Sequence, residues 1–130
     1  MGTGSQRPPL SQGQWEIMQA VWDGGEVTVA DVWKALSARR PVARNTVQTL
    51  MTRLAEKGWL RSRADGNTHH YRAAVPRSAA VKGAVRRLVD TVFGGSAEGL
   101  VHALLAGGVS PAEAARIRAL IERAEGRSSP

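Results

Sequence analysis

A run of hydrogen-bonding side chains recurs at helical spacing in the middle of the chain. The positions are i, i+3, i+4, i+7 and i+8, and they hold Asn45, Gln48, Thr49, Thr52 and Arg53. Positions with this spacing share one face of an α-helix. Exposed helix faces usually carry glutamate and lysine, whereas this one has amides, hydroxyls and one arginine, with a single acid, Glu56, at its far end. In a major groove, arginine bonds to guanine, asparagine or glutamine to adenine, and threonine to either, so this face has the chemistry needed to read base pairs.

The helix that must carry this face extends from about Ala43 to Lys57. Its predicted buried stripe consists of Val47, Leu50, Met51 and Leu54. The start of the helix is open to two interpretations, because Ala43 offers no capping oxygen, whereas Asn45 with Gln48 three residues later would form a capping box. If Asn45 caps the helix, its side chain is occupied and it becomes a weaker candidate for base readout.

Two amphipathic helices are predicted before this one. The first covers Ser11 to Trp22 and is followed by the turn residues Asp23-Gly24-Gly25, and the second is capped by Thr28, with Asp31 three residues later. Their apolar stripes are Trp15, Ile17, Met18, Val21 and Trp22, and then Val29, Val32, Trp33 and Leu36. Trp22 and Trp33 could serve as platforms for base stacking, but their positions in the stripes favour core packing.

The period changes from helical to alternating after Gly58. Residues 59–63 predict a short strand, Asp65-Gly66-Asn67 a turn, and Thr68 to Arg72 a second strand. Three helices followed directly by a β-hairpin are the arrangement of a winged helix-turn-helix. In that fold the third helix enters the major groove and the hairpin, or wing, lies along the phosphates or the minor groove.

The positive charge of the chain is concentrated in this region. The formal net charge is +7, and residues 37–72 contain eight cations against two acids, a net +6. The cations are Arg39, Arg40, Arg44, Arg53, Lys57, Arg61, Arg63 and Arg72. A solvated basic face would be the simplest interpretation, but so concentrated a charge favours nucleic acid as the partner.

The C-terminal part predicts three more helices. The first opens at Pro76 and ends at Phe93, the second follows Gly94-Gly95 with Ser96 as its cap, and the third starts at Ser110-Pro111-Ala112-Glu113. Apolar side chains along these helices are the candidate dimerisation residues: Val85, Leu88, Val89, Val92, Phe93, Leu100, Val101, Leu104, Ile117, Leu120 and Ile121. They could pack back on the winged helix, but DNA-binding proteins of this size commonly dimerise on palindromic sites, which favours a second copy.

Other classes of protein find little support. The sequence has no P-loop, HExxH or GxSxG motif. His69 and His70 are adjacent on a strand and point to opposite faces, which suits no metal. The absence of cysteine removes disulfides and thiolate sites, and no apolar run approaches the roughly 18 residues that a membrane span requires. We therefore expect a protein of the cytoplasm without membrane insertion that is not an enzyme and carries no cofactor or metal.

Several sequence pieces resemble the penicillinase-repressor family, the BlaI/MecI/CopY-type regulators of bacteria, over about Leu10 to Ala124. The pieces are Leu-Ser…Gln-Trp-Glu-Ile-Met…Val-Trp from Leu10 to Trp22, Thr-Val-Gln-Thr-Leu-Met-Thr-Arg-Leu from Thr46 to Leu54, Lys57-Gly58-Trp59-Leu60, Phe93-Gly-Gly-Ser, and Leu100-Val101. Their order and spacing together are specific to this family.

The resemblance implies a homodimer that represses transcription by occupying a dyad-symmetric operator before β-lactamase or other antibiotic-resistance genes. By position, its operator-contacting residues would be Asn45, Thr46, Gln48, Thr49, Thr52 and Arg53. The wing around Arg63 to His70 would add backbone contacts, and we include Arg44, Arg63 and His69 among the candidate DNA-binding residues.

Two departures from the family's pattern bear on regulation. The β-lactam-responsive members are inactivated by proteolysis at an Asn-Phe bond in the fifth helix, where this chain has Ala103-Leu104. Cleavage at that bond, and with it a membrane sensor protease as a partner, is therefore in doubt. Copper-responsive relatives use C-terminal cysteines, which this chain lacks, so thiolate-based copper sensing is not expected.

The predicted fold is mostly α with a small β-hairpin, a winged helix-turn-helix DNA-binding domain followed by a C-terminal helical dimerisation segment. We expect a flexible leader over 1–9, the winged helix over 10–75, the dimerisation domain over 76–124 and a disordered tail over 125–130. The alternative function is a winged helix that binds DNA or RNA without sequence choice, as a nucleoid-associated module does. A winged helix that binds protein alone would not explain the basic charge of residues 37–72.

Overall fold

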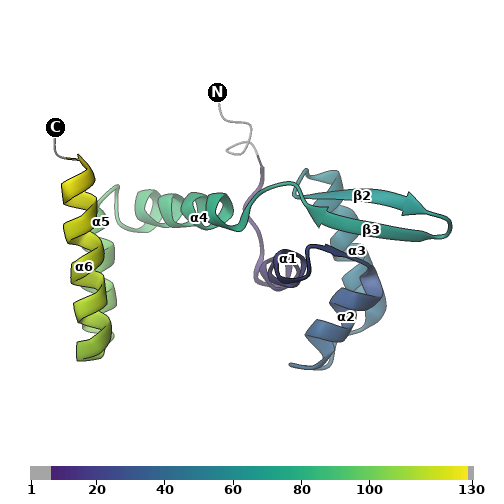
Figure 1. Ribbon diagram of the computed structural model, residues 1–130, viewed down its shortest axis with the longest axis horizontal. Helices are drawn as coiled ribbons and strands as arrows, with labels where there is room; N and C mark the ends of the chain where they lie inside the picture. Colours follow the sequence, from purple (N-terminus) through teal and green to yellow (C-terminus); the bar gives the residue numbers. More distant parts are fainter. Residues whose placement is uncertain (1–6, 129–130) are drawn as a thin grey trace. The chain divides into compact units, whose positions relative to one another are not determined.

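The order of elements follows the sequence-based expectation closely (Figure 1). The computed structural model describes residues 7–128, without the side chains of 127 and 128. Its helices and strands are α1 (Gln12–Gly24), β1 (Glu26–Val27), α2 (Val29–Ser37), α3 (Arg44–Glu56), β2 (Leu60–Asp65), β3 (Thr68–Ala73), α4 (Arg77–Val92), α5 (Ala97–Ala106) and α6 (Pro111–Ser128). They fall into two units, residues 1–85 and 86–130, whose boundary lies within α4.

The first two helices begin at reciprocal capping boxes. Ser11 Oγ accepts the backbone N–H of Gln14 at 3.2 Å, and Gln14 Oε1 accepts that of Ser11 at 2.9 Å. Thr28 Oγ1 and Asp31 Oδ2 form the same pair of bonds at the start of α2, at 3.2 and 2.9 Å. Each box satisfies two backbone donors that a helix start leaves unpaired. The box predicted at Thr28 and Asp31 is confirmed.

The hairpin of β2 and β3 belongs to a three-stranded antiparallel sheet of order β1-β3-β2. Strands β2 and β3 pair from Leu60↔Ala73 to Asp65↔Thr68, and the two residues between them form the turn. Gly66 has φ +64° in that turn, a backbone conformation that side chains rarely adopt. The third strand, β1, was not predicted from the sequence, and it pairs Glu26 with Arg72 and Val27 with Tyr71.

The core of the first unit consists of the predicted helical stripes together with one face of the sheet. Its most deeply buried side chains are Ile17, Met18 and Val21 from α1, Val32 from α2, and Val47, Met51 and Leu54 from α3, with Leu60 and Tyr71 from the sheet. Trp22 and Trp33 pack against this core, and their Nε1–H groups donate to the carbonyls of Val75 and Val42, each at 2.9 Å. Core packing of both indoles is therefore confirmed.

The last residues of the expected leader are attached to the first unit. Arg7 Nε–H donates to the carbonyl of Gly58 at 2.8 Å, and its guanidinium lies 5.9 Å from the centre of the Trp59 ring. Trp59 Nε1–H donates to the carbonyl of Pro8 at 3.2 Å. The leader was expected to be flexible over residues 1–9, but residues 7 and 8 have these contacts. The first six residues lie outside the described part of the chain.

The second unit continues α4 and adds α5 and α6, whose predicted starts are confirmed. Ser96 Oγ accepts the N–H of Gly99 at 3.0 Å, and Ser110 Oγ accepts that of Glu113 at 3.1 Å. Helix α6 continues to Ser128, past the expected start of a disordered tail at residue 125, and residues 129–130 lie outside the described range. Within residues 7–128, no helix has the length and apolar character that crossing a bilayer requires.

Candidate nucleic-acid interface

The start of α3 decides whether Asn45 caps the helix, a question that the sequence left open. The N-cap residue is Ala43, and no side chain caps the helix. The backbone N–H groups of Thr46 and Val47 bond to the carbonyl of Ala43 at 3.1 and 3.3 Å. Asn45 therefore lies in the first turn as an exposed side chain, and the interpretation in which it caps the helix is wrong.

The polar side chains predicted to share a face of α3 lie together in the structure. They line one open hollow of about 330 Å³, formed by Asn45, Gln48, Thr49, Thr52, Arg53 and Glu56. All six are exposed. The opposite side of the helix presents Val47, Met51 and Leu54 to the core. Burial of this apolar stripe fixes the rotation of α3 and so holds the polar face outward.

Two further candidates, Arg44 and Thr46, are exposed in the first turn of α3 but do not line the hollow. Their position is still suited to an anion, because the first turn of a helix has backbone N–H groups without helical partners. The Thr52 hydroxyl donates to the carbonyl of Gln48 at 2.9 Å, a contact that the sequence did not reveal.

The wing presents its charged side chains on the face of the sheet opposite to the core. Because side chains alternate along a strand, Arg61, Arg63 and Asp65 share one face of β2. The register adds their partners Arg72, His70 and Thr68, and Glu26 of β1, which pairs with Arg72. The buried Leu60 and Tyr71 occupy the other face.

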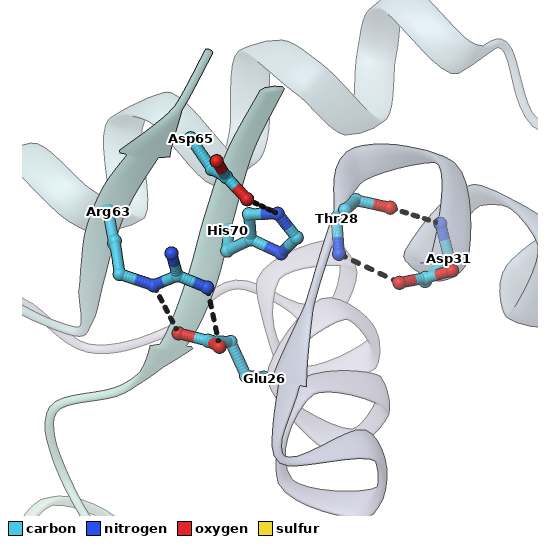
Figure 2. Close-up of polar contacts among 6 residues, drawn as sticks. All are labelled: Glu26, Thr28, Asp31, Arg63, Asp65 and His70. Carbon is cyan, nitrogen blue, oxygen red and sulfur yellow. Dashed lines mark hydrogen bonds and ion pairs between the residues drawn. The ribbon is translucent and has the colours of Figure 1, made fainter. Parts of the chain in front are cut away.

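Arg63 forms an ion pair across the sheet with Glu26 (Figure 2). Its Nε–H and Nη2–H donate to the two carboxylate oxygens at 3.2 and 3.0 Å. These hydrogen bonds from Arg63 hold the pKa of Glu26 below its usual range. Glu26 was not recognised as part of the wing, because a two-residue strand leaves no periodic signal.

The two histidines of β3 lie on opposite faces, as predicted. His70 is half-buried on the charged face, with its Nε2 atom 3.9 Å from Asp65 Oδ2 (Figure 2). The candidate DNA-binding residue His69 is exposed and lies opposite Ala64. Within residues 7–128, no three histidine, aspartate or glutamate side chains are grouped so that they could hold a metal ion.

A second open hollow, of about 680 Å³, lies beside the charged face of the wing. Its lining is Glu26, Ala55, Leu60, Arg61, Ser62, Arg63 and Arg72. Arg61 and Arg72 are directly opposite each other in the register, where like charges repel. An anion between them would relieve this repulsion, so the hollow suits a phosphate-bearing partner.

Most of the candidate dimerisation residues are exposed apolar side chains. Those that are 42–62% exposed are Val85, Leu88, Val92, Val101, Leu104, Leu120 and Ile121. Phe93, Leu100 and Ile117 are half-buried, and Val89 is buried within the chain at 4%. Ala103 and Leu104, the residues at the bond in question, are both exposed within α5.

The sequence pattern of the penicillinase repressor family matches residues 10–123 of this chain, which includes both the polar face of α3 and the wing. The chain belongs to the penicillinase repressor family. It is 36% identical to the transcriptional regulator BlaI of Mycobacterium tuberculosis over 116 residues, which cover 87% of this chain and 83% of that protein. It is 32% identical over 85 residues to an uncharacterised 16.5 kDa protein of Latilactobacillus sakei, a match that covers 65% of this chain and 58% of that protein.

The winged-helix fold is confirmed by a solved relative. The solution structure of the DNA-binding domain of the repressor BlaI matches with a TM-score of 0.50 and 28% identity, over 55% of this chain and 87% of that domain. The family and the fold make this chain a DNA-binding transcriptional repressor and not an enzyme.

Proposed function

We propose that this repressor binds as a homodimer to a dyad-symmetric operator, with α3 of each copy in a major groove. The observation that carries the proposal is the gathering of Asn45, Gln48, Thr49, Thr52 and Arg53 on one exposed face of α3. Amides, hydroxyls and a guanidinium on a helix that packs its other side into a core can reach base edges in fixed register.

Each group on this face has a preferred partner on DNA. Arg53 suits the O6 and N7 acceptors of guanine, and Asn45 or Gln48 suits the N6 and N7 atoms of adenine. Because Thr52 already donates to the Gln48 carbonyl, its oxygen acts as an acceptor and its methyl group contacts thymine. Arg44 and Thr46, in the first turn, bind phosphate, and His69 and the unpaired arginines of the wing add backbone contacts.

The second copy would cover the apolar side chains of α4, α5 and α6. A protein in water rarely leaves many large apolar side chains exposed without a partner. Five of these side chains are each at least 42% exposed: Leu88, Val92, Leu104, Leu120 and Ile121. A two-fold symmetric interface would bury the same residues on both copies. Val89, already buried within one chain, has little further area to contribute.

Membership of the family supports a proposal for the genes under control and for the signal. We propose that the operator precedes β-lactam-resistance or stress genes, and that the repressor works in the cytoplasm, where the bacterial chromosome lies. The resemblance to the β-lactam-responsive members implies release from DNA after cleavage, but this chain has Ala103-Leu104 at the position of the bond that a membrane sensor protease would cut. Release of this repressor is therefore proposed to occur at another bond or through another signal.

A competition binding experiment tests the proposal. Footprinting on DNA upstream of the repressor's own gene and its neighbours would locate the operator. The protein should then bind that palindrome at least about 10³-fold more tightly than random duplex. Equal affinity for both would favour the alternative, a winged helix that binds nucleic acid without sequence choice.

A further inference from the structure

The basic side chains on the charged face of the wing fall into two classes. Arg63 and His70 lie against carboxylates, those of Glu26 and Asp65. Arg61 and Arg72 form no ion pair within 4.0 Å among residues 7–128 and line the adjoining hollow. The guanidinium groups of Arg61 and Arg72 are therefore available to an external anion, whereas that of Arg63 is already paired with the Glu26 carboxylate.

The contact between Arg63 and Glu26 uses the donors that a phosphate would require. Arginine binds carboxylate and phosphate alike through two parallel N–H bonds. The Nε–H and one Nη2–H of Arg63 donate to the two carboxylate oxygens of Glu26 (Figure 2). A phosphate oxygen can take the same two donors only if Glu26 gives them up.

The pair is also weak enough to be exchanged. The Arg63 side chain is 54% exposed and that of Glu26 is 42% exposed. Ion pairs so open to solvent are screened by salt and contribute little to stability. The pairing of β1 with β3 holds the backbone of Glu26 beside the wing, so its carboxylate stays within reach of Arg63 while the sheet is folded.

We propose that Glu26 competes with nucleic-acid phosphate for Arg63 and so withholds this arginine from non-specific duplex. The inference deepens the proposed function, because it takes the wing to meet the DNA backbone. Every cation that binds phosphate strengthens binding to all sequences equally. A repressor must find its site among many competing sites, and an internal acid that silences one such cation weakens its binding to each of them.

The salt dependence of binding to a random-sequence duplex tests the inference. Each phosphate contact contributes about 0.9 to the slope of log Kobs against log salt. Glu26→Gln should steepen the slope by about 0.9, whereas Arg63→Ala should leave the wild-type slope unchanged. The double variant Glu26→Gln/Arg63→Ala should return to the wild-type slope, because the released arginine is then absent. All of these side chains are exposed, and circular dichroism would verify that each variant is folded.

Asp23→Asn is the matched control. Asp23 forms an exposed ion pair at 2.6 Å with Arg77 of α4 and not with an arginine of the wing, so the substitution changes the net charge equally and also releases an arginine. Its slope should equal that of the wild type, and equal steepening by Asp23→Asn and Glu26→Gln would overturn the inference. A slope that becomes shallower by about 0.9 in Arg63→Ala alone would also overturn it, because Arg63 would then already bind phosphate.

The same measurements separate this inference from the proposed function. If the wild-type protein binds DNA and its slope equals those of the three variants at Glu26 and Arg63, the role of Glu26 is refuted and the proposed function stands. If the wild-type protein binds neither random duplex nor any footprinted site, the proposed function fails and the inference fails with it.

Discussion

The hydroxyl of Thr52 donates to the backbone carbonyl of Gln48, four residues earlier on α3, at 2.9 Å. Threonine in a helix often forms this bond to the preceding turn. It leaves the Thr52 oxygen with acceptor capacity only, so the hydroxyl cannot donate to a base without first breaking a helical contact. On the proposed reading face, donor groups come instead from the amides of Asn45 and Gln48, from the Thr49 hydroxyl and from Arg53.

The first prediction concerns Arg53. Arg53→Ala should weaken operator binding by about 1–3 kcal/mol if the guanidinium bonds to a base, and should weaken random-duplex binding by much less. Fluorescence anisotropy with both duplexes at one salt concentration measures the two losses. Arg86→Ala removes an exposed arginine of α4 as a control and should preserve the operator preference. Equal losses on both duplexes in Arg53→Ala would assign Arg53 to the phosphate backbone instead.

A second prediction follows from three acids of the first unit. Hydrogen bonds from Arg40, Arg63 and the Thr28 backbone lower the pKa values of Glu16, Glu26 and Asp31 respectively. A carboxylate with a lowered folded pKa contributes stability that is complete above its unfolded pKa and is lost as pH falls through the folded value. The urea midpoint should therefore decrease as the pH falls below about 4.5, near the ordinary glutamate pKa.

The variants that remove these acids give the corresponding test. Glu16→Gln and Asp31→Asn should each lower the urea midpoint at neutral pH and make its decrease in acid shallower, because the titrating group is gone. Glu56→Gln is the control, since Glu56 is exposed and forms no ion pair among the described residues. An acid dependence that is unchanged in both variants would show that these contacts do not govern acid unfolding.

The third prediction concerns the apolar surface of α6. Leu120 is 57% exposed, so Leu120→Asp should leave the fold of one chain intact but should separate the proposed dimer by burying a charge in its interface. Operator affinity should decrease strongly, because two linked half-site contacts give avidity that a single copy lacks. Analytical ultracentrifugation and anisotropy measure the two effects.

Ala119→Asp serves as the matched control for Leu120→Asp. Ala119 is the next residue of the same helix and is exposed, and helical geometry turns it away from the face shared by Ile117, Leu120 and Ile121. The Ala119→Asp substitution adds the same charge and should leave both the dimer mass in ultracentrifugation and the operator affinity unchanged. A dimer that survives Leu120→Asp would remove α6 from the interface.

The features that the sequence predicted well are those determined by neighbouring residues. The capping box of Thr28 and Asp31 and the apolar stripe of Val47, Met51 and Leu54 depend on spacings of three or four residues. The hairpin turn at Gly66 is equally local, because positive φ selects glycine. Such patterns can be read from a single sequence without knowledge of the tertiary structure.

The features that the sequence missed depend on contacts between distant residues. The start of α3 was ambiguous by capping rules, and Trp33 holds the carbonyl of Val42 just before that helix through a bond across nine positions. The partner of Arg63 lies 37 residues earlier, in a strand whose two residues have no recognisable pattern. The sequence predicted Arg63 as a candidate DNA-binding residue but could not show that its guanidinium donates two hydrogen bonds to Glu26.

The last prediction concerns release from DNA. A protease binds its substrate as an extended strand, and both Ala103 and Leu104 lie inside the helix α5, Ala97–Ala106. Cleavage there requires this helix to open, and the bond lacks the asparagine amide and the aromatic ring that the resemblance to the family implies at the cleavage site. Opening itself is feasible, since α5 is short, exposed and followed by Gly107 and Gly108. We therefore expect the protease to reach this bond but to leave it uncut, because it does not recognise Ala103-Leu104.

We accordingly expect the full-length repressor to remain uncut at Ala103-Leu104 when its host is exposed to a β-lactam. Immunoblots of the native host, with and without the antibiotic, follow the length of the chain while a reporter follows derepression. The double substitution Ala103→Asn/Leu104→Phe should produce a fragment ending at residue 103 if a sensor protease of the family's kind is present. Loss of Leu104, Leu120 and Ile121 with the released segment would remove much of the proposed dimer surface and the avidity that it provides. A fragment of that length from the unsubstituted protein would refute the prediction, whereas an intact band during full derepression would assign induction to a ligand or a modification.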